Sequence, residues 1–577
     1  MAGPLHAEAL GELPLLAGLS AAQRAQLATE AVEVRLDAGE WLFHEGDDAR
    51  SAFVVRSGRL DVVAEGPPAA VIRSLKRGSV LGELSLLQDQ ARRTASVRAS
   101  RDSVLLQIGR EQLELLIRQA PDFAVALTRI MGAQLAANRA PAVANAAPVT
   151  VAVVGLHPDA PAAQVQAALV RELAGHGTVA RLGHDPSVPE SGFTARLDQA
   201  EHEHDRVVLV AGAQADNPAW ADFCLREADL VLAVTHGDPD GRWLDRHEPL
   251  RGCELLVCGR AMSARARAAL APREVQVAYG EDGIARAVAA TGRRLAGRAT
   301  GLVLSGGGAR AFAHLGVLEE LHASGVRFDR IGGVSMGALI GALAAMGLAP
   351  HEVYDVFTRC FVAENPTNDY TLPAFALIRG RKTRRLLDEV FGARTIEELP
   401  HRFFCVSSDL VGRRMHVHRT GLVREAVYAS LAIPGVFPPH PDGTRLLVDG
   451  GVLDNLPVQT MAERPEGPII AVDVSHRAEP EPAPQGPLHA LRRPLRRALT
   501  GTDVALPRIG ETLMRTLTLG SSDTVSIALR HADLVIAPRV DGIGLLDWRR
   551  LEQARRLGRE AAREALGESR LVAAPAP

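Results

Sequence analysis

Apolar and polar positions alternate along residues 10–110, in short stretches separated by glycine-containing turns. Period-two alternation with regularly spaced turns is typical of short strands in a small β-barrel or β-roll. From residue 110 to 138 the apolar positions instead recur at helical spacing. The pattern therefore predicts a β-roll followed by helices over residues 10–138. The Ala- and Pro-rich stretch 139–148 is expected to be a linker.

A different pattern starts at residue 149, where runs of consecutive apolar residues are separated by helix-like segments. The runs VTVAVVGL, RVVLVAG and ADLVLAVT are typical of strands buried in a parallel sheet. The first run continues as HPDAPAAQ and lacks the G-x-x-x-x-G-K-[ST] motif of a phosphate-binding loop. Residues 149–295 are therefore predicted to form an α/β domain with a structural or interface role, without a nucleotide site of that kind.

Strand and helix patterns continue to alternate after residue 300. GLVLSGGGAR and FDRIGGVSMGALIGALAAMG each place an apolar run before a glycine-rich turn and a helix-like segment. The later runs FFCVSSDL, RLLVDGG, PIIAVDVS and ADLVIAP complete a mainly parallel sheet. We predict a layered α/β domain over residues 300–570, and hence a multidomain chain of β-roll, middle α/β domain and C-terminal α/β domain.

Composition narrows the function classes. The chain of 577 residues is 47% hydrophobic and 23% charged, which is ordinary for globular domains, and its net charge of −3 gives no electrostatic basis for binding nucleic acid. Its five cysteines form no CxxC pair and fit reduced thiols, and no metal site is predicted. The N-terminus lacks a signal-peptide pattern, and no stretch reaches the roughly 18 apolar residues of a membrane-spanning helix. We expect a cytoplasmic protein whose membrane contact, at the inner face, is peripheral.

The first candidate for catalysis is Ser335. It lies in Gly333-Val334-Ser335-Met336-Gly337, which matches the G-x-S-x-G pattern of a nucleophile elbow. A serine in such a strand-to-helix turn presents its oxygen at a helix N-terminus, where backbone amides and the helix dipole favour negative charge. The five-residue pattern alone also arises by chance in chains rich in glycine and alanine.

Two other glycine-rich turns accompany this serine. The run Gly306–Gly308 between a strand and a helix would direct several backbone N–H groups into one concavity, as in an oxyanion hole. A phosphate loop is the weaker alternative, because no lysine or Walker serine follows. Asp449 ends an apolar run and precedes two glycines, which would place its carboxylate at the ligand-binding edge of a parallel sheet. Asp-Gly-Gly alone is most often only a turn.

In this order, GGGAR, GVSMG and DGG resemble the patatin-like phospholipases, which are serine lipid acyl hydrolases that use a Ser–Asp dyad and no histidine. The resemblance implies that Ser335 is the nucleophile and that Asp449 accepts its proton. Ala311 departs from the glycine common in the family, which bears on the geometry of the loop. The same resemblance implies an oxyanion hole made of Gly306, Gly307, Gly308, Ala309 and Arg310.

Histidines after Asp449 would permit a Ser–acid–His order along the chain. Three histidines follow Asp449, and none lies in a context that favours a catalytic base. His476 starts a linker-like stretch, His489 lies among arginines and prolines, and His531 precedes an apolar run. His314, four residues beyond Arg310, is better explained as a packed or capping histidine. We therefore favour a dyad over a triad.

A second candidate site lies in GELSLLQDQARRTASVRA, residues 82–99. The amides after Gly82 and the Thr94 hydroxyl suit the oxygens of a cyclic phosphate, and Arg93 suits a charge-assisted bidentate contact. Glu83, in the turn that continues with Leu84, would accept a hydrogen bond from a ribose hydroxyl.

This arrangement resembles the phosphate-binding cassette of cyclic nucleotide-binding domains, and the resemblance extends over about residues 15–135. It implies cAMP or cGMP as a regulatory ligand. A cassette that no longer binds nucleotide is the alternative, and Arg92 offers a second alignment.

The complete layout resembles bacterial relatives of neuropathy target esterase. The resemblance implies hydrolysis of phospholipid or lysophospholipid esters at a membrane surface, with no cofactor required. We expect two departures from those relatives, a single cyclic nucleotide module and no N-terminal membrane anchor. The segment 487–501, PLHALRRPLRRALTG, places leucines on one side and four arginines opposite, like an interfacial amphipathic element. A mobile basic loop, given Pro494, and a solvated surface helix are the alternatives.

Two other functions stay open at this point. One is a catalytically weak cyclic nucleotide receptor whose patatin-like domain serves as a membrane-docking or interaction module. The other is a serine peptidase, which the GGGAR and DGG motifs disfavour.

Overall fold

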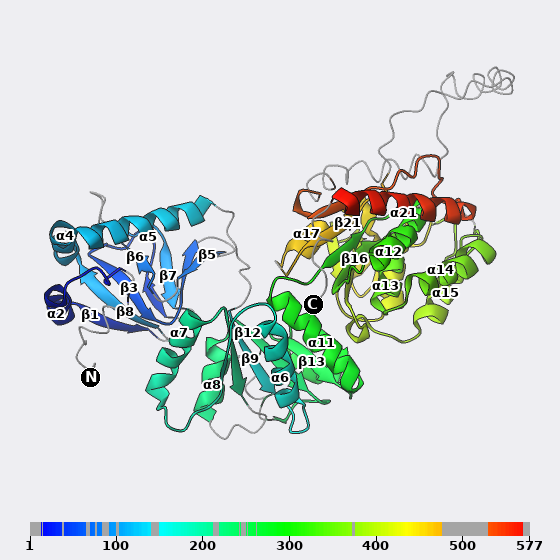
Figure 1. Cartoon of the computed structure of the whole chain (residues 1–577). Coiled ribbons are helices and arrows are strands. Elements are labelled where there is room, and N and C mark those ends of the chain that lie inside the picture. Colours follow the sequence, from blue (N-terminus) through cyan, green and yellow to red (C-terminus); the bar gives the residue numbers. More distant parts are fainter. Residues whose placement is uncertain are drawn as a thin grey trace, which may run out of the picture. The chain divides into compact units, whose positions relative to one another are not determined.

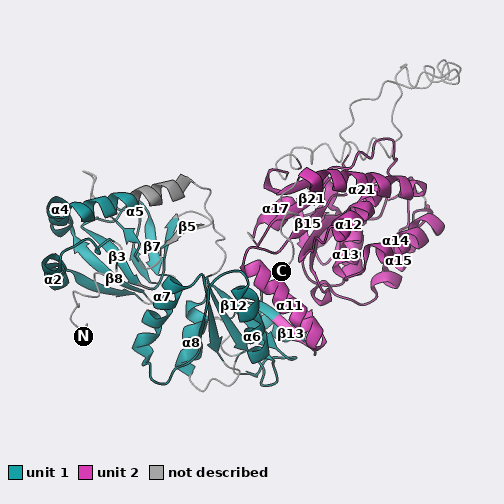
Figure 2. Cartoon of the chain, in the orientation of Figure 1, with its two compact units in different colours: residues 1–255, 262–273 teal, residues 256–261, 274–577 magenta. Residues whose placement is uncertain are grey.

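The computed structural model of the chain is shown in Figure 1. Residue contacts divide it into two compact units, 1–255 with 262–273 and 256–261 with 274–577 (Figure 2). Each unit is described by itself, and the domain boundaries expected from the sequence stay a prediction. The structure describes residues 13, 15–36, 40–64, 70–75, 78–82, 92–99, 103–139, 149–211, 218–241, 243, 250, 252–260, 262–371, 376–464, 466–475, 525 and 529–568.

The first unit begins with the β-roll that the alternating pattern predicts. Two four-stranded sheets have the orders β1-β8-β3-β6 and β2-β7-β4-β5. Inward-facing Val54, Leu106 and Ile108 are fully buried and form a core with Phe123 and Leu127 of the last helix. The elements are α2 (Ala21–Glu30), β1 (Val32–Leu36), β2 (Trp41–Phe43), β3 (Ser51–Ser57), β4 (Leu60–Ala64), β5 (Ala70–Leu75), β6 (Val80–Leu81), β7 (Ser96–Ala99), β8 (Ser103–Gly109), α4 (Arg110–Gln119) and α5 (Pro121–Arg139).

The middle region contains the α/β sheet expected from its uninterrupted apolar runs. The strand order is β10-β11-β9-β12-β13-β14, and β10, β11, β9 and β12 pair in parallel. Every residue of β9 is buried, which explains why that run lacks alternation. The elements are β9 (Thr150–Gly155), α6 (Ala162–Ala174), β10 (Val179–Leu182), α7 (Phe193–Glu203), β11 (Arg206–Ala211), α8 (Pro218–Glu227), β12 (Leu230–Thr235), β13 (Glu254–Cys258), α10 (Ala264–Leu270), β14 (Glu274–Ala278) and α11 (Gly280–Leu295).

The C-terminal part of the second unit is a layered α/β domain around an eight-stranded sheet. Its order is β19-β20-β17-β16-β15-β21-β22, with β18 also paired to β17. The strands are β15 (Gly301–Leu304), β16 (Arg330–Val334), β17 (Arg402–Asp409), β18 (Arg414–His418), β19 (His440–Asp442), β20 (Arg445–Asp449), β21 (Ile469–Val472) and β22 (Leu534–Ile536). The helices are α12 (Ala313–Ala323), α13 (Met336–Ala345), α14 (Pro350–Phe357), α15 (Arg381–Phe391), α16 (Val423–Leu431), α17 (Val458–Ala462) and α21 (Leu551–Glu568).

Strand direction in this sheet differs in one respect from the sequence-based expectation. Strands β17, β16, β15, β21 and β22 are parallel neighbours, but β20, which ends at Asp449, runs antiparallel to β17. β20 is the returning strand of a hairpin with β19, and it pairs with β17 in the opposite direction to β16. Because Val334 pairs with Val406 and Asp449 pairs with Ser407, the ends of β16 and β20 still lie on either side of β17 at the same level.

Two glycines allow the C-terminal helix to close over this domain. Gly316 of α12 faces the backbone of Arg555 in α21, and Gly558 of α21 faces the backbone of Ala313 in α12. A Cβ at either glycine would overlap the carbonyl oxygen opposite. The two helices therefore pack with their backbones in contact, which Figure 1 shows as the red helix beside α12.

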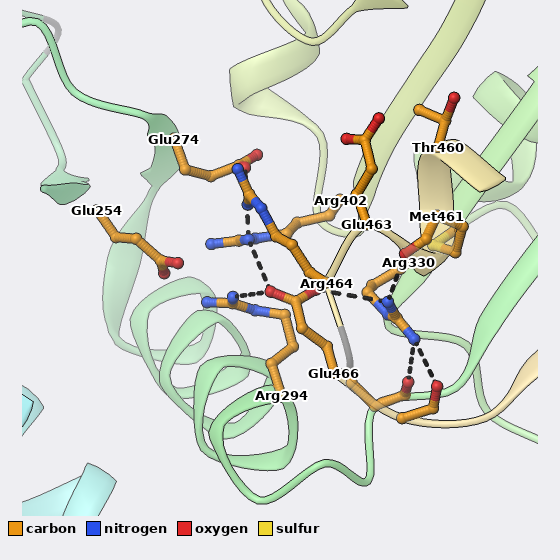
Figure 3. Close-up of polar contacts among 12 residues, drawn as sticks. Glu254, Glu274, Arg294, Arg330, Arg402, Thr460, Met461, Glu463, Arg464 and Glu466 are labelled. Carbon is orange, nitrogen blue, oxygen red and sulfur yellow. Dashed lines mark hydrogen bonds and ion pairs between the residues drawn. The ribbon is translucent and has the colours of Figure 1, made fainter. Parts of the chain in front are cut away.

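A cluster of ion pairs lies at the amino ends of the parallel strands, the end of the sheet opposite Ser335 (Figure 3). The carboxylate of Glu466 is 2.8 Å from Nη1 of Arg294 and 3.5 Å from Nη1 of Arg330. The side chains of Arg294 and Arg330 are 2% and 4% exposed, so both cations need such partners to be tolerated in the interior. Burial lowers the pKa of Arg330 to about 10, which leaves it charged at neutral pH.

None of the helices in the described part of the chain is both long enough and apolar enough to cross a bilayer. The segment 487–501, with its leucines and arginines, lies outside the described residues.

Candidate active site

Ser335 occupies a strained turn between β16 and α13. Its φ of 54° and ψ of −127° are unusual for a residue with a side chain, and such conformations persist only where the surroundings enforce them. A Cβ at Gly333 would lie 2.6 Å from the carbonyl oxygen of Gly337, and one at Gly337 would lie 2.5 Å from that of Ser305. Both flanking positions therefore require glycine, which gives the G-x-S-x-G pattern a steric basis.

The turn directs Ser335 at Asp449. The hydroxyl of Ser335 donates a hydrogen bond of 2.5 Å to Oδ2 of Asp449, and the N–H of Gly451 donates one of 2.8 Å to Oδ1. Both side chains are buried, with 6% of each residue exposed. Burial raises the pKa of Asp449 to about 6, although the hydrogen bonds from Ser335 and Gly451 act in the opposite direction. The two residues that the sequence singled out thus form a serine–carboxylate pair.

No histidine among the described residues is hydrogen-bonded to this pair. His314 is fully buried in α12, where Nε2 contacts the carbonyl oxygen of Ser305 at 2.9 Å. Burial lowers the pKa of His314 to about 4, so the ring is neutral. His531 ends a short 3₁₀ turn. His476 and His489 lie outside the described residues.

The glycine-rich loop after β15 is held by two other segments and by a hydrogen bond within the loop. The N–H of Gly306 donates to the carbonyl oxygen of Asn455 at 3.3 Å, and that of Arg310 to the carbonyl oxygen of Gly307 at 3.1 Å. The N–H of Ala309 donates to the carbonyl oxygen of Leu545 at 2.8 Å. Within the part of the chain that the structure describes, the N–H groups of Gly307 and Gly308 have no hydrogen-bond acceptor. They are the two amides of the predicted set still open to a ligand.

This loop lies against the nucleophile. A Cβ at Gly306 would be 3.1 Å from Cβ of Ser335 and 2.6 Å from Oδ1 of Asn455. Gly308 has a φ of 55°, and Nε of Arg310 donates to the carbonyl oxygen of Ile543 at 2.8 Å. The guanidinium therefore anchors the loop to the segment after β22.

The candidate nucleotide site is partly described. Arg93 is buried, with its guanidinium carbon 4.1 Å from the ring centroid of Phe43, and it lies so close to Gly82 that a Cβ there would collide with it. Arg92 instead points outward and donates to the carbonyl oxygen of Gly46 at 2.8 Å. Thr94 is exposed, whereas Glu83 and Leu84 lie outside the described residues. Of the two arginines that could align with the phosphate-binding position of the cassette, Arg93 is the one that points inward beside Gly82.

Comparison with known proteins matches a family model to each of the regions that contain these candidate sites. A family model described as patatin-like phospholipase matches residues 302–462, and one described as cyclic nucleotide-binding domain matches residues 33–120. An uncharacterised NTE family protein of Mycobacterium tuberculosis is 36% identical over 572 residues, which cover 97% of this chain and 96% of that protein. The chain belongs to the NTE, or neuropathy target esterase, family. The resemblance inferred from the sequence motifs is thereby confirmed.

Other NTE relatives are considerably longer than this chain. Lysophospholipase NTE1 of Cryptococcus neoformans is 27% identical over 553 residues, which cover 78% of this chain and 33% of the fungal protein. Neuropathy target esterase sws of Drosophila melanogaster is 24% identical over 514 residues, which cover 76% of this chain and 35% of the fly protein. The matches thus span about a third of these two relatives.

Three residues of the site in this NTE family member were missed by reasoning from the sequence. Ser430 accepts a hydrogen bond from the N–H of Ser335, and Asn455 and Leu545 hold the glycine-rich loop. Ser430 lies in SLAIPGVFPP, a stretch that suggests no role by itself. Asn455 follows the DGG motif by four residues, whereas nothing in the sequence marks Leu545.

Proposed function

We propose that this NTE family member is a serine lipid acyl hydrolase that releases fatty acid from phospholipid or lysophospholipid esters. The observation that carries the proposal is the 2.5 Å hydrogen bond from Ser335 to Asp449 at a strained strand-to-helix turn. The match to the patatin-like phospholipase model supports the same reaction class, and a relative named lysophospholipase supports the substrate class.

The reaction proceeds by acyl transfer in two steps. The Ser335 hydroxyl oxygen attacks the ester carbonyl carbon while its proton passes to Asp449, and the carbonyl oxygen takes the negative charge. The N–H groups of Gly307 and Gly308 donate to that oxyanion, as preorganised amides do in acyl-transfer enzymes. Asp449 then gives the proton to the departing alcohol. A water molecule attacks the acyl-enzyme with Asp449 as its base, and fatty acid leaves.

Fatty acid release from lysophospholipid tests this proposal. Wild-type chain is compared with Ser335→Ala, and with Ser324→Ala as a matched serine substitution outside the site. Ser335→Ala is expected to lose activity by about three orders of magnitude, and Ser324→Ala to keep it. Equal release by Ser335→Ala and the wild type would rule out the proposed mechanism.

The pH dependence follows from the burial of Asp449. Because the pKa of this carboxyl is raised to about 6 and only the ionised form accepts the serine proton, kcat/KM is expected to rise with pH and level off above about pH 6. Below that value it should fall about tenfold for each pH unit. The measurement is the pH profile of kcat/KM on a soluble short-chain ester. A profile that stays flat down to about pH 4 would show that Asp449 is not the base.

We infer further that the N-terminal β-roll binds a cyclic nucleotide, cAMP or cGMP, as a regulatory ligand. The cyclic nucleotide-binding model covers Gly82 and Arg93, and the guanidinium lies beside that glycine, at the start of the cassette. A guanidinium in this position suits the cyclic phosphate as a charge-assisted partner.

Substitution of the two adjacent arginines tests the nucleotide site. Arg93→Ala is expected to weaken nucleotide binding at least tenfold, because a charge-assisted hydrogen bond contributes about 1.5–3 kcal/mol. The outward-facing Arg92→Ala is the control and should bind as the wild type does. Calorimetric titration with cAMP and with cGMP measures the affinity of each full-length variant and of the wild type. Absence of binding of either nucleotide to the wild type would contradict the inference.

A further inference from the structure

The backbone N–H of Ser335 has a dedicated acceptor. It donates a hydrogen bond of 2.9 Å to Oγ of Ser430, and the hydroxyl of Ser430 in turn donates one of 2.7 Å to the carbonyl oxygen of Val406. Ser430 is completely buried. Because the hydroxyl proton is committed to Val406, a lone pair of Oγ is left to face the N–H of Ser335. The orientation of this contact is therefore fixed.

The segment that contains Ser430 also contacts the backbone of Asp449. The N–H of Asp449 donates to the carbonyl oxygen of Ala432 at 2.9 Å. Ser430 and Ala432 lie at the C-terminal end of α16, where backbone carbonyl groups have no hydrogen-bond partner within the helix. One short segment thus contacts the backbone of both members of the dyad, at the nucleophile through a side chain and at the acid through a carbonyl oxygen.

The strained backbone of Ser335 explains why its hydrogen bond to Ser430 matters. A residue with a side chain at a φ of 54° relaxes unless its neighbours prevent it, and relaxation would turn the Ser335 hydroxyl away from Asp449. Catalytic groups must be held within about 0.5 Å of their productive positions. The flanking glycines permit the strained turn, but they do not hold it in place. The hydrogen bond from Ser335 to Ser430 supplies a restraint at the strained residue itself.

We propose that Ser430 is a positioning residue that holds the Ser335 turn in its reactive conformation. The proposal rests on the function proposed above, because it assumes that Ser335 is the nucleophile. It assigns Ser430 no contact with substrate. Loss of its hydroxyl should therefore slow the chemical step without weakening substrate binding.

The test compares Ser430→Ala with Ser430→Thr, which keeps the hydroxyl, and with Thr383→Ala. Thr383 is a suitable control because it is likewise buried in the second unit and its hydroxyl donates to the carbonyl oxygen of Pro366, which is not a residue of the dyad. Kinetic constants are measured on a soluble short-chain ester, with thermal unfolding of each variant to establish the folded fraction. Ser430→Ala is expected to lose kcat at least tenfold with KM within about twofold, since a displacement near 1 Å lowers rates to that extent or more.

Ser430→Thr should recover most of the lost kcat, and Thr383→Ala should match the wild type. The proposal is overturned if Ser430→Ala keeps its kcat, if a folded Ser430→Thr is as slow as Ser430→Ala, or if Thr383→Ala loses as much. Ser335→Ala separates this result from the proposed function. An active Ser335→Ala refutes the function itself, whereas an inactive Ser335→Ala beside a fully active Ser430→Ala refutes only the role of Ser430.

Discussion

Replacing Asp449 with asparagine is expected to lower fatty acid release by about three orders of magnitude. The carboxylate is hydrogen-bonded to the Ser335 hydroxyl, and no histidine among the described residues is bonded to that serine. Asparagine has nearly the same shape and still accepts from the N–H of Gly451, but its amide does not take up the serine proton. The measurement is kcat on lysophospholipid. Activity within tenfold of the wild type would show that another group acts as the base.

The same substitution is expected to stabilise the fold above about pH 6, which distinguishes lost chemistry from lost structure. The pKa of Asp449 is raised from 3.8 in the free side chain to about 6 in the folded protein. The contribution of Asp449 to the free energy of unfolding is therefore largest below pH 3.8, where the carboxyl is protonated, and it is lost as pH rises through 6. Keeping the buried carboxylate ionised therefore costs about 3 kcal/mol, and a neutral asparagine avoids that cost.

Thermal unfolding near pH 8 and near pH 4 checks this expectation, with the wild type as reference. Asp449→Asn should unfold at a higher temperature than the wild type near pH 8, and the difference should shrink towards pH 4. A variant that is both inactive and less stable near pH 8 would contradict the assignment of a buried, ionised carboxylate.

Gly308→Ala is the second substitution with a large expected effect. Gly308 has a φ of 55°, and an added Cβ would collide with the carbonyl oxygen of Leu545, which accepts from the next amide, that of Ala309. The loop must shift, and the N–H groups proposed to hold the oxyanion shift with it. Since loss of one such donor lowers kcat by about a hundredfold or more, we expect at least that loss, with KM little changed.

Gly325→Ala is the matched control for backbone strain. Gly325 also has a positive φ, of 75°, but a Cβ there meets open space. This variant should lose a little stability and keep its kcat. If Gly308→Ala retains full activity, the glycine-rich loop is not the oxyanion hole. If Gly325→Ala loses as much kcat, the effect of Gly308→Ala is one of general strain.

Much of the fold was predictable from the pattern of apolar and polar residues along short stretches of the chain. The β-roll followed from alternation, and the buried parallel strands followed from uninterrupted apolar runs. These two features depend on neighbouring residues, and a short stretch of sequence records them. The pairing of Ser335 with Asp449 was instead implied by the resemblance of three glycine-rich motifs, in one order, to the patatin-like phospholipases. The steric need for glycine at positions 333 and 337 is visible as the G-x-S-x-G pattern itself.

What escaped prediction depends on contacts between distant segments. The antiparallel direction of β20 is apparent only from its pairing with β17, and Ser430 is recognisable only once α16 is packed beside the nucleophile. The open amides of Gly307 and Gly308 are distinguished from that of Ala309 by Leu545, which lies more than two hundred residues away along the chain. No spacing rule connects positions so far apart.

The most direct test of the central claim is the site and rate of covalent labelling by a fluorophosphonate, which reacts with activated serine hydroxyls. Full-length wild type and Asp449→Asn are incubated with the reagent, digested, and analysed by mass spectrometry at successive times. The dyad predicts one modified residue, Ser335, and labelling slowed by at least a hundredfold in Asp449→Asn. Modification of a different serine, or equal labelling of Ser335 in the two proteins, would contradict it.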